Sequence, residues 1–297
     1  MLQLLIEQCH CDEVELLSDA LEETGALSVT LTDQYDEPIL EPAPGAIPLW
    51  TNVVMTALFE EASDAEQALK TLSAQYPHLT FSTHLLPDQD WERTCMIDFK
   101  PQHFGQRLWV CPSWIAPPEP DAVNLILDPG LAFGTGTHQT TSLCLTWLEQ
   151  ANLQQQYVID YGCGSGILGL AALKLGAQHV SAVDIDEQAL LATQNNALNN
   201  GITATQLTVG QPELLQTPVD LIIANILLTP LLTLQKRFRE LLNNAGMLVV
   251  SGLLVDQIST LIDTYHTDFI HHATFLQDDW ALVVFTPRMI AENRAIH

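Results

Sequence analysis

The residues with the clearest chemical potential are three alternating glycines that directly follow a short apolar stretch. Gly162, Gly164 and Gly166 come after residues 158–161, and a helical apolar pattern follows at once. Glycines at a strand-to-helix turn allow a ligand to lie against the backbone, because no Cβ atom stands in its way. The next apolar stretch ends in Asp184, whose carboxylate is suitably placed to accept hydrogen bonds from ribose hydroxyls. These features indicate a site for an adenosine-containing cofactor.

Two classes of cofactor fit these glycines. Residues 164–169 match the dinucleotide fingerprint G-x-G-x-x-G, which would bind a nicotinamide cofactor. Residues 160–166 match Asp-x-Gly-x-Gly-x-Gly, which resembles the first motif of class I methyltransferases that use S-adenosylmethionine. Asp160 suits the ammonium of that cofactor, or a water that bridges to it, and it would sit badly beside a pyrophosphate. The glycines alone leave this choice open, and a tight turn without a ligand is a third interpretation.

Three motifs in a fixed order resemble a single family. Residues 127–141 read Leu-Asp-Pro-Gly-Leu-Ala-Phe-Gly-Thr-Gly-Thr-His-Gln-Thr-Thr, the glycine motif follows, and residues 225–227 read Asn-Ile-Leu. This order resembles the PrmA family, which methylates large-subunit ribosomal protein eleven. The sequence departs from the family at Gln139, where many members have proline, and at residues 228–229, where Leu-Thr replaces the usual Ala-Gly. The resemblance covers nearly the whole chain, including residues 91–93 and 104–114.

The resemblance implies S-adenosylmethionine as cofactor and a set of residues that bind it. Gly162 would make room for the methionine portion, and Asp184 would bind the ribose. Thr141 would present its hydroxyl and amide to the cofactor, or else cap the helix that it begins. Phe133 could face the sulfonium through cation–π attraction, or be a core aromatic. The residues expected at the cofactor are Thr141, Asp160, Gly162, Gly164, Asp184, Asn225 and Phe133.

Asn225 is the candidate for positioning the target amine. It ends an otherwise apolar strand pattern, where a polar side chain needs a reason. In class I enzymes that methylate nitrogen, an asparagine at this point accepts hydrogen bonds from the target amine, often before Pro-Pro-Tyr or Pro-Pro-Phe. Here those prolines and the aromatic residue are missing, and a satisfied turn residue is the alternative. His138 is expected to be a polar loop residue without a catalytic role.

The resemblance implies a reaction at amines of the ribosomal protein, namely lysine ε-amines and the N-terminal α-amine. The sulfonium is already an activated methyl donor, so the protein must mainly align the groups and exclude water. Two other functions stay open. The embedded dinucleotide fingerprint allows a nicotinamide-dependent oxidoreductase, and the composition allows a non-catalytic acidic binding or ribosomal assembly factor.

Charge is distributed unevenly along the chain. The 297 residues contain 36 acids and 10 bases, a net charge of −26, and 47% of them are hydrophobic. Residues 1–86 alone hold 15 acids and one base, Lys70. Such a surface repels nucleic acid and attracts cationic partners, although solubility or adaptation to salt is the simpler explanation. Because ribosomal proteins are generally basic, the family resemblance favours docking of a basic protein to this segment.

The order of apolar patterns predicts two domains. Residues 1–86 show the order β-α-β-β-α-β, which is ferredoxin-like, and they are expected to recognise the substrate. Residues 87–100 form a linker. In residues 101–297 strands and helices alternate, and the last two strands look antiparallel. This pattern predicts an α/β fold, a seven-stranded, doubly wound, Rossmann-like sheet of the class I methyltransferase type.

No metal site or membrane span is expected from the sequence. In Cys9-His10-Cys11, strand alternation would place the histidine on the face opposite to both cysteines, and no second ligand pair follows. The six cysteines show no disulfide-like spacing, and Cys144 and Cys163 are expected to be small buried residues. No apolar run reaches the ~20 residues of a membrane span, and no signal peptide is evident. A cytoplasmic protein is therefore expected.

Overall fold

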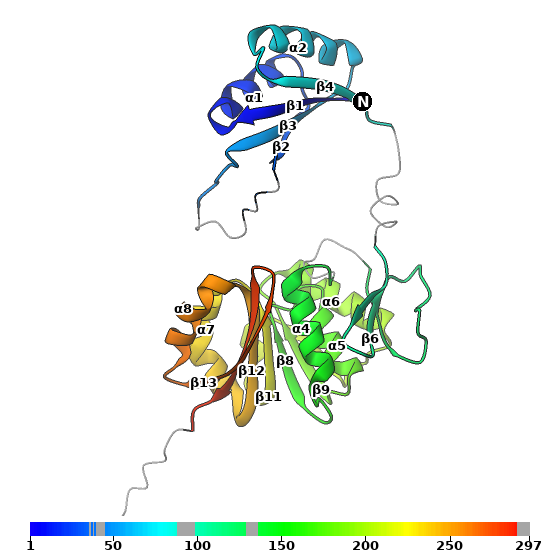
Figure 1. Cartoon of the computed structure of the whole chain (residues 1–297). Helices are drawn as coiled ribbons and strands as arrows, with labels where there is room; N and C mark the ends of the chain where they lie inside the picture. Colours follow the sequence, from blue (N-terminus) through cyan, green and yellow to red (C-terminus); the bar gives the residue numbers. More distant parts are fainter. Residues whose placement is uncertain (36, 38, 40–44, 88–98, 129–135, 290–297) are drawn as a thin grey trace, which may run out of the picture. The chain divides into compact units, whose positions relative to one another are not determined.

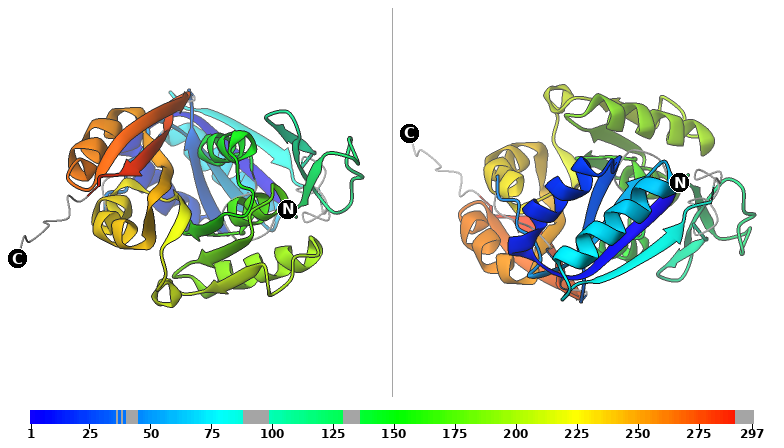
Figure 2. Two further views of the ribbon diagram at one scale, coloured as in Figure 1. Left: turned by 90° about the horizontal axis from the view of Figure 1, so that it is seen from below. Right: turned by 90° about the horizontal axis from the view of Figure 1, so that it is seen from above.

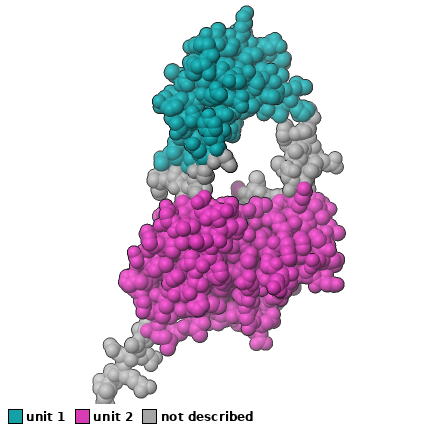
Figure 3. Space-filling model, viewed as in Figure 1, with its two compact units in different colours: residues 1–92 teal, residues 93–297 magenta. Residues whose placement is uncertain are grey.

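The computed structural model describes residues 1–35, 37, 39, 45–87, 99–128 and 136–289. The chain divides into two compact units, Met1–Glu92 (unit 1) and Arg93–His297 (unit 2), which Figure 3 colours teal and magenta. Each has its own hydrophobic core. The predicted linker, residues 87–100, lies mostly outside the described residues. In the described part of the chain, no helix combines the length and the apolar composition that a membrane span would require.

Unit 1 is a four-stranded antiparallel sheet with two helices. Its strands lie in the order β2-β3-β1-β4, and both helices come between strands in the chain order β-α-β-β-α-β (Figure 1). Alternate residues of β3 are buried, so that one face of the sheet packs against the helices, as a period of two requires. The elements are β1 (Leu2–His10), α1 (Val14–Glu23), β2 (Ser28–Asp33), β3 (Asn52–Phe59), α2 (Ala62–Gln75) and β4 (Thr80–Leu85).

Helix α1 shows how the sequence fixes these elements. Val14, Leu17 and Leu21 recur at helical spacing, and all three are buried against the sheet. The helix ends at Glu23 with Thr24 as its C-cap, and the next residue is Gly25, whose φ of +96° favours a residue without a side chain. The amides of Gly25 and Ala26 then donate to the carbonyls of Glu22 and Leu21, each at 3.0 Å. These bonds give partners to carbonyl groups of the last helical turn.

Unit 2 is built on a seven-stranded mixed sheet. Its strand order is β10-β9-β8-β11-β12-β14-β13, and β14 is antiparallel to both of its neighbours. The chain runs outward from β8 to β10 and then returns to β11, so the order reverses between β8 and β11. The strands are β8 (Tyr157–Tyr161), β9 (His179–Val183), β10 (Leu207–Gly210), β11 (Val219–Asn225), β12 (Leu242–Leu254), β13 (Phe269–Gln277) and β14 (Trp280–Pro287).

Helices cover both faces of this sheet (Figure 2). Successive strand residues belong to opposite cores: Val158 packs on one face and Ile159 on the other. Strands buried on both faces have continuous apolar sequences, which explains the pattern at residues 221–224. One core contains α4 (Gln139–Gln150), α5 (Ile167–Lys174) and α6 (Glu187–Asn199); the other contains α7 (Leu228–Leu241) and α8 (Ile258–Tyr265).

A small sheet precedes α4 in the sequence. It consists of β5 (Gln102–Phe104), β6 (Leu108–Cys111) and β7 (Val123–Ile126), in that order. The end of β7 is tied to α6 by Asn200, whose Nδ2 donates to the Ile126 carbonyl while its Oδ1 accepts from the Ile126 amide. The small sheet therefore joins unit 2 close to the helix that follows Asp184.

Candidate functional site

The three alternating glycines form the turn between β8 and α5, as the sequence predicts. Gly162, Gly164 and Gly166 have φ values of +76°, +55° and +81°, which L-residues rarely adopt. The amides of Gly162 and Cys163 donate to the carbonyl of Val183 at the end of β9, at 2.8 and 3.0 Å. The loop is thus held against the neighbouring strand, and Gly166 is the N-cap of α5.

Asp184 lies beside this loop, directly after β9. Its Oδ2 accepts a hydrogen bond from the Gly164 amide at 3.0 Å, and its Oδ1 accepts one from the Asp186 amide at 3.0 Å. The helix N-cap is Asp186, whose Oδ1 accepts from Gln188, so Asp184 is not needed for capping. The structure therefore brings two of the predicted cofactor residues, Gly164 and Asp184, into direct contact.

Asp160 is placed differently from the sequence prediction of a ligand contact. Its side chain is fully buried beneath the glycine loop, where Oδ2 accepts from the Gly169 amide at 2.8 Å. Its Oδ1 has no hydrogen-bond partner among the described residues. Burial, with a smaller contribution from the charge of Asp184, raises the pKa of Asp160 to about 7. Because the carboxyl group is enclosed, it holds the start of α5 and offers no surface for direct contact with a ligand, whereas contact through a bridging water stays a prediction.

Two residues of α6 that sequence reasoning missed fix the loop from the other side. Thr193 donates through Oγ1 to the carbonyl of Gly164 at 3.0 Å, and Asn196 donates through Nδ2 to the carbonyl of Ser165 at 2.9 Å. Both side chains are buried. A Cβ on Gly166 would lie 2.8 Å from Cγ2 of Thr193, so the close approach of α6 also requires that glycine. The available signal was the spacing i, i+3 of two polar residues on the buried side of a helix.

Asn225 and Thr141, predicted from separate motifs, meet in the structure. Asn225 is the last residue of β11, and its Nδ2 donates to Oγ1 of Thr141 at 3.3 Å. Thr141 lies in the first turn of α4 and is 1% exposed, whereas Asn225 is half-buried. The alternative in which Thr141 caps its helix is wrong, since His138 is the N-cap and its side chain accepts from the Thr140 amide.

A cavity of about 460 Å³ opens next to Asn225. His138 and Trp280 stand at one side of it, with ring centroids 4.8 Å apart in an edge-to-face arrangement. Because β14 is antiparallel to β12, its first residue, Trp280, reaches the edge at which β11 and β12 end. Burial lowers the pKa of His138, which favours the neutral imidazole. The remaining lining residues are Thr140, Ile226, Leu227, Pro230 and Gly252.

Phe133, the predicted cation–π residue, lies outside the described residues, as do residues 91–93 of the family resemblance. Cys144 and Cys163 are buried free thiols, as predicted, and burial raises the pKa of each.

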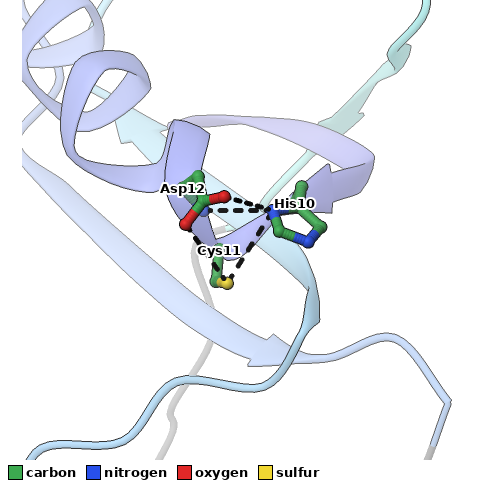
Figure 4. Close-up of side chains that lie close together, drawn as sticks. All are labelled: His10, Cys11 and Asp12. Atoms are coloured by element: carbon green, nitrogen blue, oxygen red, sulfur yellow. Dashed lines mark hydrogen bonds and ion pairs between the residues drawn. The ribbon is translucent and has the colours of Figure 1, made fainter.

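The expectation for Cys9-His10-Cys11 needs one correction (Figure 4). Cys9 is buried and His10 exposed, as strand alternation requires, but β1 ends at His10 and Cys11 turns into a short 3₁₀ segment, Cys11–Glu13. Nδ1 of His10 therefore lies 3.8 Å from Sγ of Cys11 and 3.3 Å from Oδ2 of Asp12. These consecutive residues could supply three ligands, one fewer than a structural zinc site takes, and Nδ1 already accepts from the Asp12 amide.

Comparison with known proteins relates nearly the whole chain to one family. The sequence model of the family described as ribosomal protein L11 methyltransferase (PrmA) matches residues 2–288. A protein of that name from Legionella pneumophila (strain Lens) is 60% identical over 286 residues, which cover 96% of this chain and 99% of that protein. A protein of the same name from Nitrosococcus oceani is 51% identical over 275 residues, covering 91% and 94%.

A solved structure supports the same comparison. The crystal structure of ribosomal protein L11 methylase from Lactobacillus delbrueckii subsp. bulgaricus superimposes with a TM-score of 0.59 at 32% sequence identity. The match covers 64% of this chain and all of that chain.

Proposed function

The chain belongs to the family of ribosomal protein L11 methyltransferases, and from this we propose that it transfers methyl groups from S-adenosylmethionine to amines of that basic ribosomal protein. The amines are lysine ε-amines and the N-terminal α-amine. The observation that carries the proposal is the placement of the glycine loop, Asp184 and Asn225 at one edge of the sheet in unit 2. Membership of a methyltransferase family sets aside the oxidoreductase and the non-catalytic assembly factor.

The charges around the loop fit a cationic cofactor better than a pyrophosphate. Asp160 lies under the loop, Asp184 lies beside it, and the charge of Asp184 contributes to the raised pKa of Asp160. The charge of Asp184, to which Asp160 adds when it is ionised, would repel phosphate oxygens and attract an ammonium and a sulfonium. S-Adenosylmethionine carries both cations and supplies an activated methyl group when bound.

Contacts of the glycine loop and of the two aspartates are compatible with roles at the cofactor. Each carboxylate oxygen of Asp184 accepts a hydrogen bond from one backbone amide. Each oxygen therefore keeps a second acceptor site for a ribose hydroxyl. Gly162 and Gly164 expose backbone to the cofactor. Asp160 acts on the cofactor through the loop that it anchors, by way of the Gly169 amide. For Phe133 the cation–π contact stays a prediction from the sequence.

Asn225 is assigned to the target amine, with Thr141 orienting it. Because Nδ2 of Asn225 donates to Thr141, its Oδ1 is left without a partner among the described residues and can accept a hydrogen bond from an amine N–H. That bond would align the nitrogen lone pair with the methyl group, which is the main requirement of the transfer. The missing prolines after Asn225 are replaced here by Ile226 and Leu227, which line the adjacent cavity.

The cavity beside Asn225 suits the neutral form of an amine. A lysine has a reference pKa of ~10.4 and must lose its proton before it can attack the methyl group. In the described part of the chain, no carboxylate is among the residues that line the cavity, and most of them are apolar. Desolvation there would lower the pKa of the amine, whereas a nearby carboxylate would raise it. The carboxylates of the described residues therefore lie outside this lining.

Unit 1 is the proposed substrate-recognition domain, residues 1–86, with a ferredoxin-like arrangement of strands. Most of its described exposed carboxylates lie on the helical side, at α1, α2 and the turns before them, whereas Glu37 lies in the loop after β2. The open face of the sheet bears hydroxyls and apolar side chains, such as Thr30, Thr56 and Leu58. We expect the helical side to attract a basic protein and to disfavour nucleic acid. An enzyme that modifies a ribosomal protein would work in the cytoplasm.

The test is methyl transfer from labelled S-adenosylmethionine to purified ribosomal protein L11 by the full chain. Label should appear in the ribosomal protein, and Asn225→Ala should lower the rate. A parallel titration with reduced nicotinamide dinucleotide should show no binding. Absence of transfer by the folded protein, or tight binding of the nicotinamide cofactor alone, would contradict the proposal.

A further inference from the structure

Ile226, the residue after Asn225, lies between two glycines from different strands. A Cβ added to Gly162, at the end of β8, would come within 2.4 Å of Cγ2 of Ile226. A Cβ added to Gly252, within β12, would come within 2.5 Å of the Ile226 carbonyl oxygen. Both glycines have positive φ, +76° and +84°. The space that a side chain would need at either position is therefore occupied by Ile226.

Gly252 lies at an irregularity in β12. The pairing of β12 with β14 shifts its register between Ser251 and Leu253, and Gly252 is the residue in between. A bulge with a glycine of positive φ redirects a strand locally, and bulges of this kind are frequent next to active sites. Here the irregularity brings the backbone of β12 against the backbone of Ile226, at the start of the turn that leads to α7.

The backbone of Asn225 and Ile226 is fixed by the same strand. Asn225 pairs with Ser251 across β11 and β12, and the Ile226 amide donates to the Ser251 carbonyl at 3.2 Å. The Ser251 hydroxyl donates in turn to the Ala281 carbonyl at 2.8 Å. On the opposite side, Cγ2 of Ile226 rests against the glycine loop. The direction in which Asn225 leaves its strand is thus set from both sides.

We propose that Ile226 is a positioning residue that holds Asn225 in register with the glycine loop. The inference rests on the proposed function, in which the loop faces the cofactor and Asn225 faces the target amine. Contact between Cγ2 of Ile226 and Gly162 fixes the distance between these two parts of the site. Methyl transfer is sensitive to this distance, because a displacement of about 1 Å can cost ~100-fold in rate. Gly162 is accordingly required by Ile226 as well as by the cofactor.

Three substitutions separate the Cγ2 contact from simple packing. Ile226→Val keeps Cγ2 and removes only the terminal methyl group. Ile226→Leu keeps the number of carbons but moves the branch away from Cβ, so that Cγ2 is lost. Ile226→Ala removes Cγ2 together with all other side-chain carbons beyond Cβ. Because Ile226 also lines the cavity, the comparison is made among the variants: we expect kcat of the leucine and alanine variants to lie ~10- to 100-fold below kcat of the valine variant. Cofactor affinity, measured by calorimetry without the protein substrate, should change by less than ~3-fold in all three.

A double substitution tests the contact without measuring turnover. Gly162→Ala should lower the melting temperature less in an Ile226→Ala background than in the wild type, because Cγ2 is then absent. The strain of the positive φ is the same in both backgrounds, so the difference reports the contact alone.

Three results would overturn the proposal. They are equal kcat for the leucine and valine variants, losses of kcat that follow melting temperature across the series, and an unchanged effect of Gly162→Ala in the double substitution. Failure of the proposed function is distinguishable, since the wild-type protein would then transfer no methyl group before any variant is compared.

Discussion

Replacing Asp160 by asparagine should make the stability of unit 2 less sensitive to pH. The wild-type carboxyl is fully buried, with Oδ2 bound to the Gly169 amide and Oδ1 without a partner among the described residues. Asparagine has the same shape and imitates the protonated acid, because its Oδ1 can accept from Gly169 while its NH₂ group takes the place of the hydroxyl. The substitution therefore removes a titration and keeps the anchoring hydrogen bond.

The sign and size of the effect follow from the pKa of Asp160. Burial raises this pKa from 3.8 to about 7, so the folded state binds the proton more tightly than the unfolded state does. The stabilisation is full below the unfolded pKa and is lost as the pH rises through the folded pKa. At ~1.36 kcal/mol per pH unit, the loss between pH 4 and pH 7 reaches about 3 kcal/mol. Between pH 5 and pH 8 it should be about 2–3 kcal/mol.

The measurement is urea denaturation of wild type and Asp160→Asn at pH 5 and pH 8. The free-energy advantage of the variant should be larger at pH 8 by about 2–3 kcal/mol. Asp263→Asn, at an exposed carboxylate of α8, is the matched control and should show a small difference at both pH values. An advantage for Asp160→Asn that is the same at pH 5 and pH 8 would refute the reasoning.

Three further predictions concern the proposed site. Asp184→Asn should weaken cofactor binding ~10- to 100-fold by calorimetry, because a charge-assisted ribose contact is lost; unchanged affinity would reject the ribose assignment. Asn225→Ala should lower kcat ~10- to 100-fold and leave cofactor affinity within ~3-fold. Equal losses of both would make Asn225 a cofactor ligand instead. In unit 1, Asp19→Lys with Glu22→Lys on α1 should raise KM for the ribosomal protein ~10-fold at low salt, and less at high salt. An unchanged KM in this double variant would contradict docking of the ribosomal protein on the helical side.

Much of the site could be predicted because parallel strands end at one edge of a sheet. Gly162 and Asp184 directly follow the mainly apolar strands β8 and β9, and Asn225 ends the mainly apolar strand β11. Once these runs are recognised as neighbouring parallel strands, the three residues must gather at the carboxyl edge. The same logic predicts the alternating core, because successive residues of a strand face opposite layers of helices.

The missed residues are those whose partners lie far away in the sequence. Thr193 binds a carbonyl 29 residues away, and Trp280 reaches the cavity because the last strand runs antiparallel to β12. Neither fact follows from local periodicity. The direct ligand contact predicted for Asp160 was wrong for a related reason. Its position in the motif is the same whether its side chain faces a ligand or the start of a helix, and the structure shows it packed against Gly169 of α5. Cys11 was misplaced because alternation holds only while the strand continues.

The order of strands explains why one contact joins the two parts of the proposed site. The chain runs from β8 outward to β9 and β10, then returns to β11 and continues to β12. The loop and carboxylate proposed for the cofactor therefore lie at the ends of β8 and β9, and Asn225, proposed for the target amine, lies at the end of β11. Between β8 and β11 the helices that follow these strands depart to opposite faces, which opens the edge of the sheet to ligands. Across this opening Ile226 touches Gly162, so in the proposed site the geometry of methyl transfer would depend on a residue that bonds neither reactant.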